Sequence, residues 1–271
     1  DPAHLGGVDN FCWPSIQYDP EKNPDGRFKA AQLVRSCRAL SDTCMAYEIP
    51  LLSGKDSMYV DGHLPGRYEE THKLSALESL QFSTIGVIAD IEQAVTMDVK
   101  APGDLVYMLG ETFDELGASE YYAAFGYVGK NVPRVRPERF RKIYNALHQA
   151  IRQGLIASAH GIYRGGLGVH LAMTAMGGNL GLNVDISKAP GAQSLRPDHL
   201  LFSETPGRFL ITISPKNAAA FESLFEAGQF ACLGEVTDKP VLDVFEGGRP
   251  LISVSVSDLK SAWKRPFGGL I

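Results

Sequence analysis

Short apolar runs alternate with amphipathic stretches through the second half of the sequence, and this alternation limits the possible folds more than any other feature. LVYMLG at residues 105–110 is a continuous apolar run, typical of a strand buried on both faces of a sheet. Residues 140–151 carry apolar side chains at helical spacing, with Gly154 as the expected C-terminal cap. Residues 155–176 read as strand, glycine turn and helix, and residues 209–214 read as a strand. The pattern predicts an α/β layer structure.

The first hundred residues carry a different pattern and are expected to form a separate domain. Residues 30–44 repeat apolar side chains at helical spacing, residues 49–60 read as strand, tight glycine turn and strand, and residues 80–91 read as a strand. APGD at residues 101–104 then marks a boundary. A length of 271 residues accommodates two medium domains. We therefore expect domains at residues 1–100 and 101–271.

The segment SGKDS, residues 53–57, is the best local candidate for binding chemistry. Gly54 lets an oxygen atom approach the backbone, Lys55 supplies a positive charge, and Ser57 supplies a hydroxyl group. The spacing is not that of a Walker A loop. Phosphate binding is one interpretation, and an ordinary hairpin turn is the other.

Two further segments allow both a functional and a structural interpretation. HGIYRGGLG, residues 160–168, places glycines and Arg164 before a helix, which favours either anion binding or close packing of strand and helix. His160 is the one histidine at a strand end. GETFDELGASEYY, residues 110–122, carries four carboxylates that suit Mg²⁺, but a solvated loop with Ser119 as a helix cap explains them as well.

Composition excludes several classes of protein. A formal net charge of −5 gives no electrostatic footprint for nucleic acid, and the sequence contains no apolar run long enough to span a membrane. The four cysteines form no CxxC pair, so a structural zinc site is not expected. Cys37 and Cys44 are expected to be buried as small hydrophobic residues. Reduced cysteines indicate a cytoplasmic protein.

Several of these segments together resemble one enzyme family, phosphoribosylformylglycinamidine synthase. VDNFCWP, SGKDSM, GETFDELGASEYY, residues 155–176 and LFSETPGRFLI occur in the order seen in that family. The resemblance implies an α/β (α+β) fold: an AIR-synthetase-like N-terminal domain that builds a barrel, followed by an AIR-synthetase-like C-terminal α/β domain. The family carries two tandem copies of this unit. The chain resembles the second copy only, as a C-terminal fragment whose upstream part has about the same size or more.

The resemblance also implies a set of binding residues. Asp9 of the D-N motif and Gly54 match nucleotide-binding positions, and Ser57 matches a substrate-binding position. Lys55 stands where small-type relatives often carry an Asn ligand of Mg²⁺, so a contact with an ATP phosphate is expected there in place of a metal. The catalytic histidine and most Mg²⁺ ligands belong to the first copy. The chain is therefore expected to contribute no catalytic residue and no metal ligand.

One motif departs from the family pattern. Many members carry H-D-x-S-D-G-G in this copy, whose Asp and Ser serve an auxiliary nucleotide. Here residues 160–166 read HGIYRGG, without either carboxylate or the Ser. A nucleotide site that has lost its carboxylates and gained Arg164 no longer suits a metal. We expect this auxiliary site to be degenerate and structural.

The resemblance implies a ligase that forms a C–N bond with glutamine as amido donor. It converts formylglycinamide ribonucleotide to formylglycinamidine ribonucleotide with ATP and Mg²⁺. Expected partners are the upstream first half, a glutaminase and small accessory subunits, and the isolated chain is expected to be inactive and to self-associate. The alternative is a non-catalytic, degenerate synthetase-like module retained for assembly. Another ATPase of the superfamily is disfavoured by the SEYY and GKDSM segments.

Overall fold

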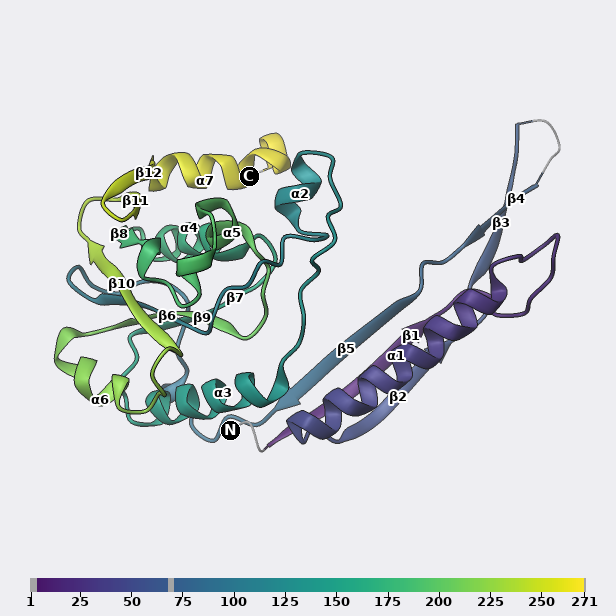
Figure 1. Ribbon diagram of the computed structural model, residues 1–271, viewed down its shortest axis with the longest axis horizontal. Coiled ribbons are helices and arrows are strands. Elements are labelled where there is room, and N and C mark those ends of the chain that lie inside the picture. The colour runs from purple at the N-terminus through teal and green to yellow at the C-terminus, as the bar shows by residue number, and fades with distance from the viewer. Residues whose placement is uncertain (1–3, 68–70, 271) are drawn as a thin grey trace. The chain divides into compact units, whose positions relative to one another are not determined.

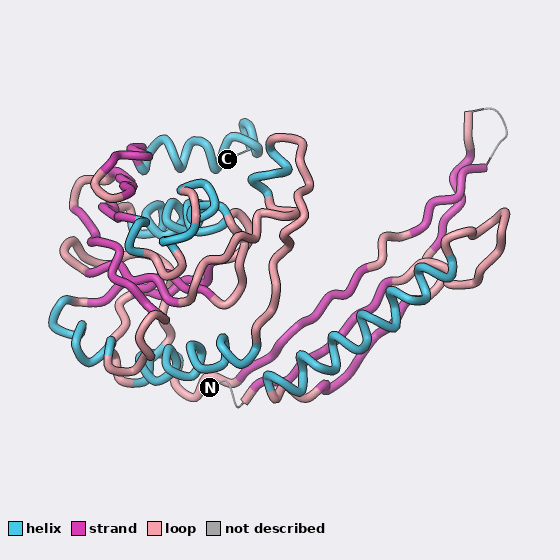
Figure 2. Tube along the Cα trace, viewed as in Figure 1, coloured by secondary structure: helices cyan, strands magenta, loops and turns pink. Residues whose placement is uncertain are grey.

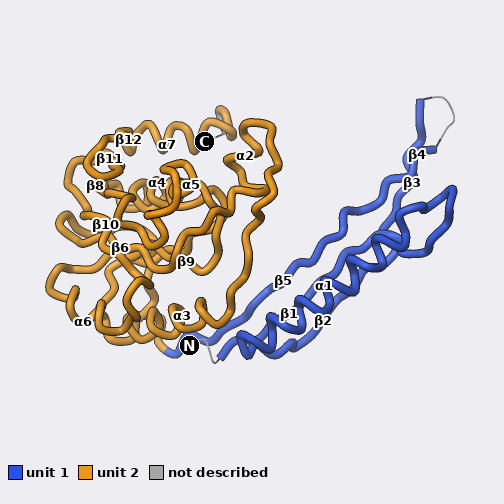
Figure 3. Tube along the Cα trace, viewed as in Figure 1, with its two compact units in different colours: residues 1–89 blue, residues 90–271 orange. Residues whose placement is uncertain are grey.

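The computed structural model describes residues 4–67 and 71–270, which divide into two compact units (Figure 3). The first unit comprises residues 1–89 and the second comprises residues 90–271. The expected boundary after residue 100 lies later in the chain than this division. Val99 explains the difference, because its side chain is 2% exposed and packs in the core of the second unit. The division into domains at residue 100 stays a prediction.

The first unit is a small open sheet with one long helix (Figure 1). Its three-stranded sheet has the order β2-β1-β5, with β1 parallel to β2 and antiparallel to β5. A separate antiparallel hairpin is formed by β3 and β4. The elements are β1 (Leu5–Cys12), α1 (Gly26–Tyr47), β2 (Leu51–Ser57), β3 (Asp61–Pro65), β4 (Thr71–Ser75) and β5 (Ser79–Gly86).

The glycine turn predicted for SGKDS is wrong. These residues continue strand β2, which pairs with β1 from Leu51 to Ser57. Gly54 does not have the positive φ typical of glycine in a type I′ or II′ hairpin turn. The ladder with β1 supplies partners along the whole segment, and it overrides the local turn preference of Gly and Ser.

The second unit is a seven-stranded mixed sheet with helices on both faces (Figures 1 and 2). The strand order is β12-β11-β8-β10-β6-β9-β7, and only β8 and β11 pair in parallel. The strands are β6 (Leu105–Leu109), β7 (Ser158–Ile162), β8 (Gly181–Asp185), β9 (Arg208–Ile213), β10 (Phe230–Thr237), β11 (Val241–Glu246) and β12 (Arg249–Ser255). The helices are α2 (Glu120–Ala124), α3 (Pro137–Arg152), α4 (Gly166–Gly178), α5 (Pro197–Phe202), α6 (Ala218–Glu222) and α7 (Val256–Lys264).

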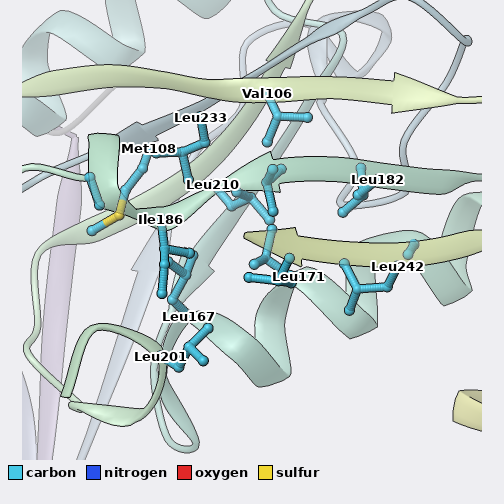
Figure 4. Close-up of a cluster of buried hydrophobic side chains, with 14 of the residues drawn as sticks. Val106, Met108, Leu167, Leu171, Leu182, Ile186, Leu201, Leu210, Leu233 and Leu242 are labelled. Atoms are coloured by element: carbon cyan, nitrogen blue, oxygen red, sulfur yellow. The ribbon is translucent and has the colours of Figure 1, made fainter. Parts of the chain in front are cut away.

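Strand β6 lies between two hydrophobic cores, as its apolar run predicted. Val106 and Met108 pack on the side of α4 and α5, where Leu171 and Leu201 complete the cluster shown in Figure 4. Tyr107 and Leu109, with the opposite side-chain direction, pack on the side of α3 and α6. The predicted helix at 140–151 and the strand, turn and helix at 155–176 are also confirmed, as α3, β7 and α4.

Candidate functional site

The predicted site residues meet where strand β1 runs beside strand β2. The parallel register sets Asp9 opposite Gly54, Asn10 opposite Lys55 and Cys12 opposite Ser57. Residues opposite one another on paired strands share a face, and neighbours along a strand alternate between faces. Asp9 and Gly54 therefore lie on one face, and Lys55 and Ser57 lie on the other.

Gly54 is required by the position of the Asp9 carboxyl group. A Cβ atom added at Gly54 would lie 2.7 Å from Oδ1 and 3.1 Å from Cγ of Asp9. The Asp9 side chain thus fills the space over the Gly54 backbone, and Asp9 is only 9% exposed. The two residues form one structural element, although they lie far apart in the sequence.

The Asp9 face borders a cavity of about 560 Å³ within the first unit. Asp9 and Asp56 line it from the strands, and Cys37 and Cys44 line it from α1. Burial, and to a lesser degree the Asp9 charge, raises the pKa of the Cys44 thiol. The expected burial of both cysteines is wrong, since Cys37 is exposed and Cys44 half-buried. The reason is the cavity, which keeps this helix face from packing tightly on the sheet.

Lys55 and Ser57 form a separate polar pair on the other face. The Lys55 ammonium group donates a hydrogen bond to Ser57 Oγ, two residues along the same strand. Lys55 is exposed and Ser57 is half-buried. This face thus offers a positive charge and a hydroxyl group side by side, which is a suitable pair for a phosphate or another oxyanion.

The described residues contain no preassembled cluster of metal ligands. No group of three or more His, Cys, Asp and Glu side chains is arranged to hold a metal ion within residues 4–67 and 71–270. Asp9 stands on the face opposite Lys55, and the Lys55 ammonium has no lone pair for a metal. Lys55 therefore cannot be a ligand of Mg²⁺ at this position.

Each of the four carboxylates of residues 110–122 has an Arg or His side chain as its partner. Arg139 pairs with Glu111 at 2.9 Å, Arg136 with Glu115 at 2.7 Å, His199 with Asp114 at 2.9 Å, and Arg164 with Glu120. The Ser119 hydroxyl accepts a hydrogen bond from the Tyr122 N–H as the cap of α2. The structure thus favours the capped loop over the Mg²⁺ site that the sequence left open.

The anion position at the start of α4 is filled by a side chain of the protein. Glu204 Oε1 accepts hydrogen bonds from the Gly165 N–H at 2.8 Å and the Glu120 N–H at 2.9 Å. These are backbone donors at the starts of α4 and α2, which attract negative charge. Glu204 therefore joins the two helix ends, and Arg164 beside it is already paired with Glu120.

His160 and His170 form a hydrogen-bonded pair beneath the glycine turn. The Tyr163 N–H donates to His170 Nε2 at 2.9 Å, so the proton of neutral His170 is on Nδ1. His170 Nδ1 lies 2.9 Å from His160 Nε2 and donates to it. Burial, reinforced by the charge that His160 can carry, lowers the pKa of His170 to about 4. Burial also lowers the pKa of His160. With both rings neutral, the hydrogen-bonded histidine pair holds the glycine turn in place.

The unfolding free energy should fall as the pH drops from about 6.5 towards 4. His170 has a pKa below its ordinary value in the folded protein, so the unfolded chain binds the extra proton first. Neutral His170 contributes its full share to the free energy of unfolding above about pH 6.5, and this share is on the order of 3 kcal/mol. Denaturant unfolding between pH 4 and 7 measures it. His170→Asn keeps one acceptor and one donor without titrating, so its profile should be flatter; an unchanged profile contradicts the assignment.

Arg208 is a buried cation that the sequence analysis did not single out. Its guanidinium group donates to the Thr205 carbonyl at 2.8 Å, the Ser203 carbonyl at 2.6 Å and Thr112 Oγ1 at 3.0 Å. Burial lowers the pKa of Arg208 to about 9, so it remains charged at neutral pH. Arg208 thereby ties residues 110–116 to the segment that carries Glu204. Arg208 lies in the motif LFSETPGRFLI, but no neighbouring residue in the sequence indicates that this Arg is buried.

Comparison with protein families and curated relatives identifies the family of the chain. Residues 101–246 match the family described as AIR synthase related protein, C-terminal domain. The PurL subunit of phosphoribosylformylglycinamidine synthase from Carboxydothermus hydrogenoformans is 33% identical over 252 residues, covering 92% of this chain and 32% of the relative. The PurL subunit from Thermococcus sibiricus is 32% identical over 209 residues, covering 77% and 28%. The chain thus spans about a third of the length of these relatives, and the resemblance seen in the motifs is confirmed.

Solved structures show the same fold at low sequence identity. T. maritima PurL complexed with FGAR has a TM-score of 0.66 at 17% identity, with 95% of this chain and 40% of that chain covered. T. maritima PurL complexed with ATP has a TM-score of 0.61 at 18% identity, covering 95% and 38%. E. coli HypE, a hydrogenase maturation protein, has a TM-score of 0.59 at 15% identity, covering 89% and 70%. The expected AIR-synthetase-like fold class is confirmed.

Proposed function

The chain belongs to the AIR synthase related protein family, and on this premise we propose that it forms part of a phosphoribosylformylglycinamidine synthase. That enzyme is a ligase that amidates formylglycinamide ribonucleotide with ATP and glutamine-derived ammonia. The observation that carries the proposal is the parallel pairing of β1 with β2, because it joins the Asp9 and Gly54 motifs in one register. Two segments far apart in the sequence thereby form one binding element.

Asp9 and Gly54 are the proposed contacts to the nucleoside part of ATP. A carboxylate can accept hydrogen bonds from ribose hydroxyl groups or from the adenine amino group. The cavity beside Asp9 has the volume and the largely apolar walls that suit a ligand of this size. In support, T. maritima PurL has been solved in complexes with ATP and ADP.

Lys55 and Ser57 are the proposed contacts where phosphate and substrate meet. Lys55 would hold an ATP phosphate as a point charge, and Ser57 would donate a hydrogen bond to formylglycinamide ribonucleotide. Lys55 lies on the face opposite Asp9, so one ATP molecule would reach both residues by passing around the edge strand β2. Their side-by-side position on one strand favours this division, because phosphoryl transfer requires both reactants within one small volume. Mg²⁺ for the reaction would be held outside this chain.

The proposed partners follow from the same assignment. They are the first half of the synthetase, a glutaminase and small accessory subunits, and a PurLQS structure from T. maritima supports the principle of such an assembly. We propose a reducing, cytoplasmic location, which agrees with four free cysteines. None of the helices in the described part of the chain is long and apolar enough to cross a membrane.

The isolated chain should self-associate through the open sheet of the first unit. Leu52 on one edge strand is 62% exposed and Ile85 on the other is 63% exposed. Exposed apolar edge strands drive pairing between chains. Sedimentation velocity over a range of concentrations should show dimers or larger species, and Ile85→Lys should reduce them. A strict monomer at high concentration contradicts this expectation.

Turnover of formylglycinamide ribonucleotide with ATP and ammonium tests the function. The full-length protein that contains this chain should turn over the substrate, whereas the 271-residue chain alone should not. The physical reason is that the resemblance assigns the catalytic histidine to the first copy, and none of the described residues that line the cavity beside Asp9 is a histidine. An inactive full-length protein contradicts the function, and activity of the isolated chain contradicts the division between halves.

The alternative, a non-catalytic module retained for assembly, is favoured by one specific observation. Glu204 fills the anion position at the start of α4, and Arg164 is paired with Glu120. A nucleotide phosphate at the turn of residues 160–166 would have to displace Glu204, which supports the expected degenerate site. This alternative predicts that changes at Asp9 and Ser57 leave the activity of the full-length protein unaltered.

A further inference from the structure

A groove in the second unit is lined by three of the six methionines of the chain. It has a volume of about 420 Å³ and lies between α4 and α7, which pack side by side on one face of the sheet (Figure 1). Met173 and Met176 come from α4, Met97 precedes the first strand of the unit, and Trp263 comes from α7. We refer to it as the methionine groove.

The groove keeps a large apolar side chain in contact with solvent. Trp263 is 56% exposed, whereas Trp13, the other tryptophan, is 2% exposed. Methionine side chains are flexible and polarisable, and surfaces rich in Met adapt to the apolar face of an incoming helix. An exposed Trp next to such a surface is the residue type that most often dominates binding energy at interfaces.

Two lysines on α7 line the same groove. Lys260 and Lys264 are four residues apart and therefore lie on one side of the helix. Lys260 donates a hydrogen bond to the neutral Asn179 Oδ1 at 2.9 Å. Asp258, the nearest acid along the helix, is hydrogen-bonded to Ser255 instead. Within the described residues neither lysine forms an ion pair, so the groove combines an apolar floor with a positive rim.

We propose that the methionine groove docks an amphipathic helix of a separate protein, with apolar side chains against the methionines and carboxylates against the lysines. The apolar floor alone would accept any hydrophobic segment. The uncompensated charges of Lys260 and Lys264 select an acidic one, because a basic helix would meet repulsion at the rim. This interface uses neither Asp9 nor Ser57, so it is independent of the proposed enzymatic function.

Synthetic helical peptides of about 15 residues provide the probe. The acidic peptide carries Leu at positions i, i+3, i+4 and i+7 and Glu on the remaining face. A second peptide replaces Glu with Lys, and a third keeps Glu but replaces Leu with Ser. Fluorescence of Trp263 reports occupancy of the groove, and Trp263→Phe serves as the blank. The acidic apolar peptide should shift the emission to shorter wavelength, and the other two should not.

Four variants, two tests each with a control, separate the charge from the apolar contact. The double variant Lys260→Glu with Lys264→Glu should weaken the acidic peptide by about tenfold or more and should now bind the basic peptide. Lys216→Glu with Lys239→Glu, outside α4 and α7 in the same unit, is the matched control and should change neither affinity. Met173→Gln should weaken binding, whereas Met173→Leu, which keeps the surface apolar, should retain it.

Three results would overturn the proposal. The first is equal binding of acidic and basic peptides, which would show a general hydrophobic surface. The second is absence of saturable binding by the acidic apolar peptide. The third concerns the full-length protein: iodide quenching of Trp263 should match that of the 271-residue chain, and protection of Trp263 there would show that another part of the same protein covers the groove.

Discussion

Replacement of Arg208 by methionine is expected to lower the free energy of unfolding by about 3–5 kcal/mol. The Arg208 side chain is 1% exposed and donates hydrogen bonds to two carbonyl oxygens and one hydroxyl group. Methionine fills a similar volume but donates nothing, so the Ser203 and Thr205 carbonyls and the Thr112 hydroxyl would each lose a buried donor. Chemical denaturation followed by circular dichroism measures the loss.

The control for this prediction is Arg196, whose side chain is 72% exposed and pairs with Asp198. Arg196→Met should change the unfolding free energy by no more than about 1 kcal/mol, because a surface ion pair contributes little. Arg208→Lys should recover only part of the loss, since an ammonium group cannot reach three acceptors in the geometry of the guanidinium fork. Equal stability of the Arg208→Met and Arg196→Met variants would contradict the role of Arg208.

Much of the second unit could be predicted because its signals are local. The run LVYMLG has no polar position, and β6 is buried between two cores as that composition requires. The helix at residues 137–152 follows directly from apolar spacing. Strand β1 was not predicted, because LGGVDNFC contains residues that disfavour strands when taken alone. Its conformation is set by pairing with β2 and β5, which lie more than 40 positions away in the sequence.

The candidate site shows the same limit more sharply. The resemblance identified Asp9, Gly54, Lys55 and Ser57, but it did not separate them into two faces. SGKDS taken alone favours a turn, and only the register with β1 converts it to a strand whose side chains alternate. The close approach of Asp9 to Gly54 then explains why position 54 carries no side chain. Motif matching thus predicted the residues, and strand pairing determined the geometry.

Three other features depend on contacts between distant segments and left no sequence signal. Glu204 reaches the Gly165 and Glu120 N–H groups, and Arg208 reaches Thr112. The His170 ring accepts the N–H of Tyr163 across the glycine turn. In each case the sequence shows the residue type, but the partner of that residue depends on which loops lie next to one another in the folded chain. Such pairings need a tertiary structure.

The expected effects at Asp9 and Ser57 are large and directed at different ligands. Asp9→Asn keeps the shape that fits over Gly54 but removes a charge, so it should raise the KM for ATP by about 10- to 100-fold. Ser57→Ala removes one hydrogen bond and should raise the KM for formylglycinamide ribonucleotide by about five- to tenfold, with the KM for ATP nearly unchanged.

Lys55→Ala should raise the KM for ATP and make that KM less sensitive to salt. Neither Lys55 nor Ser57 is buried, so melting temperatures should stay close to that of the unaltered protein.

Both Michaelis constants should be measured in the full-length protein carrying Asp9→Asn or Ser57→Ala, with the melting temperature of each variant as a control. We predict that Asp9→Asn raises the KM for ATP more than that for formylglycinamide ribonucleotide, and that Ser57→Ala does the opposite. Folded variants whose two constants both equal those of the unaltered protein would contradict the assignment of strands β1 and β2 to the active site.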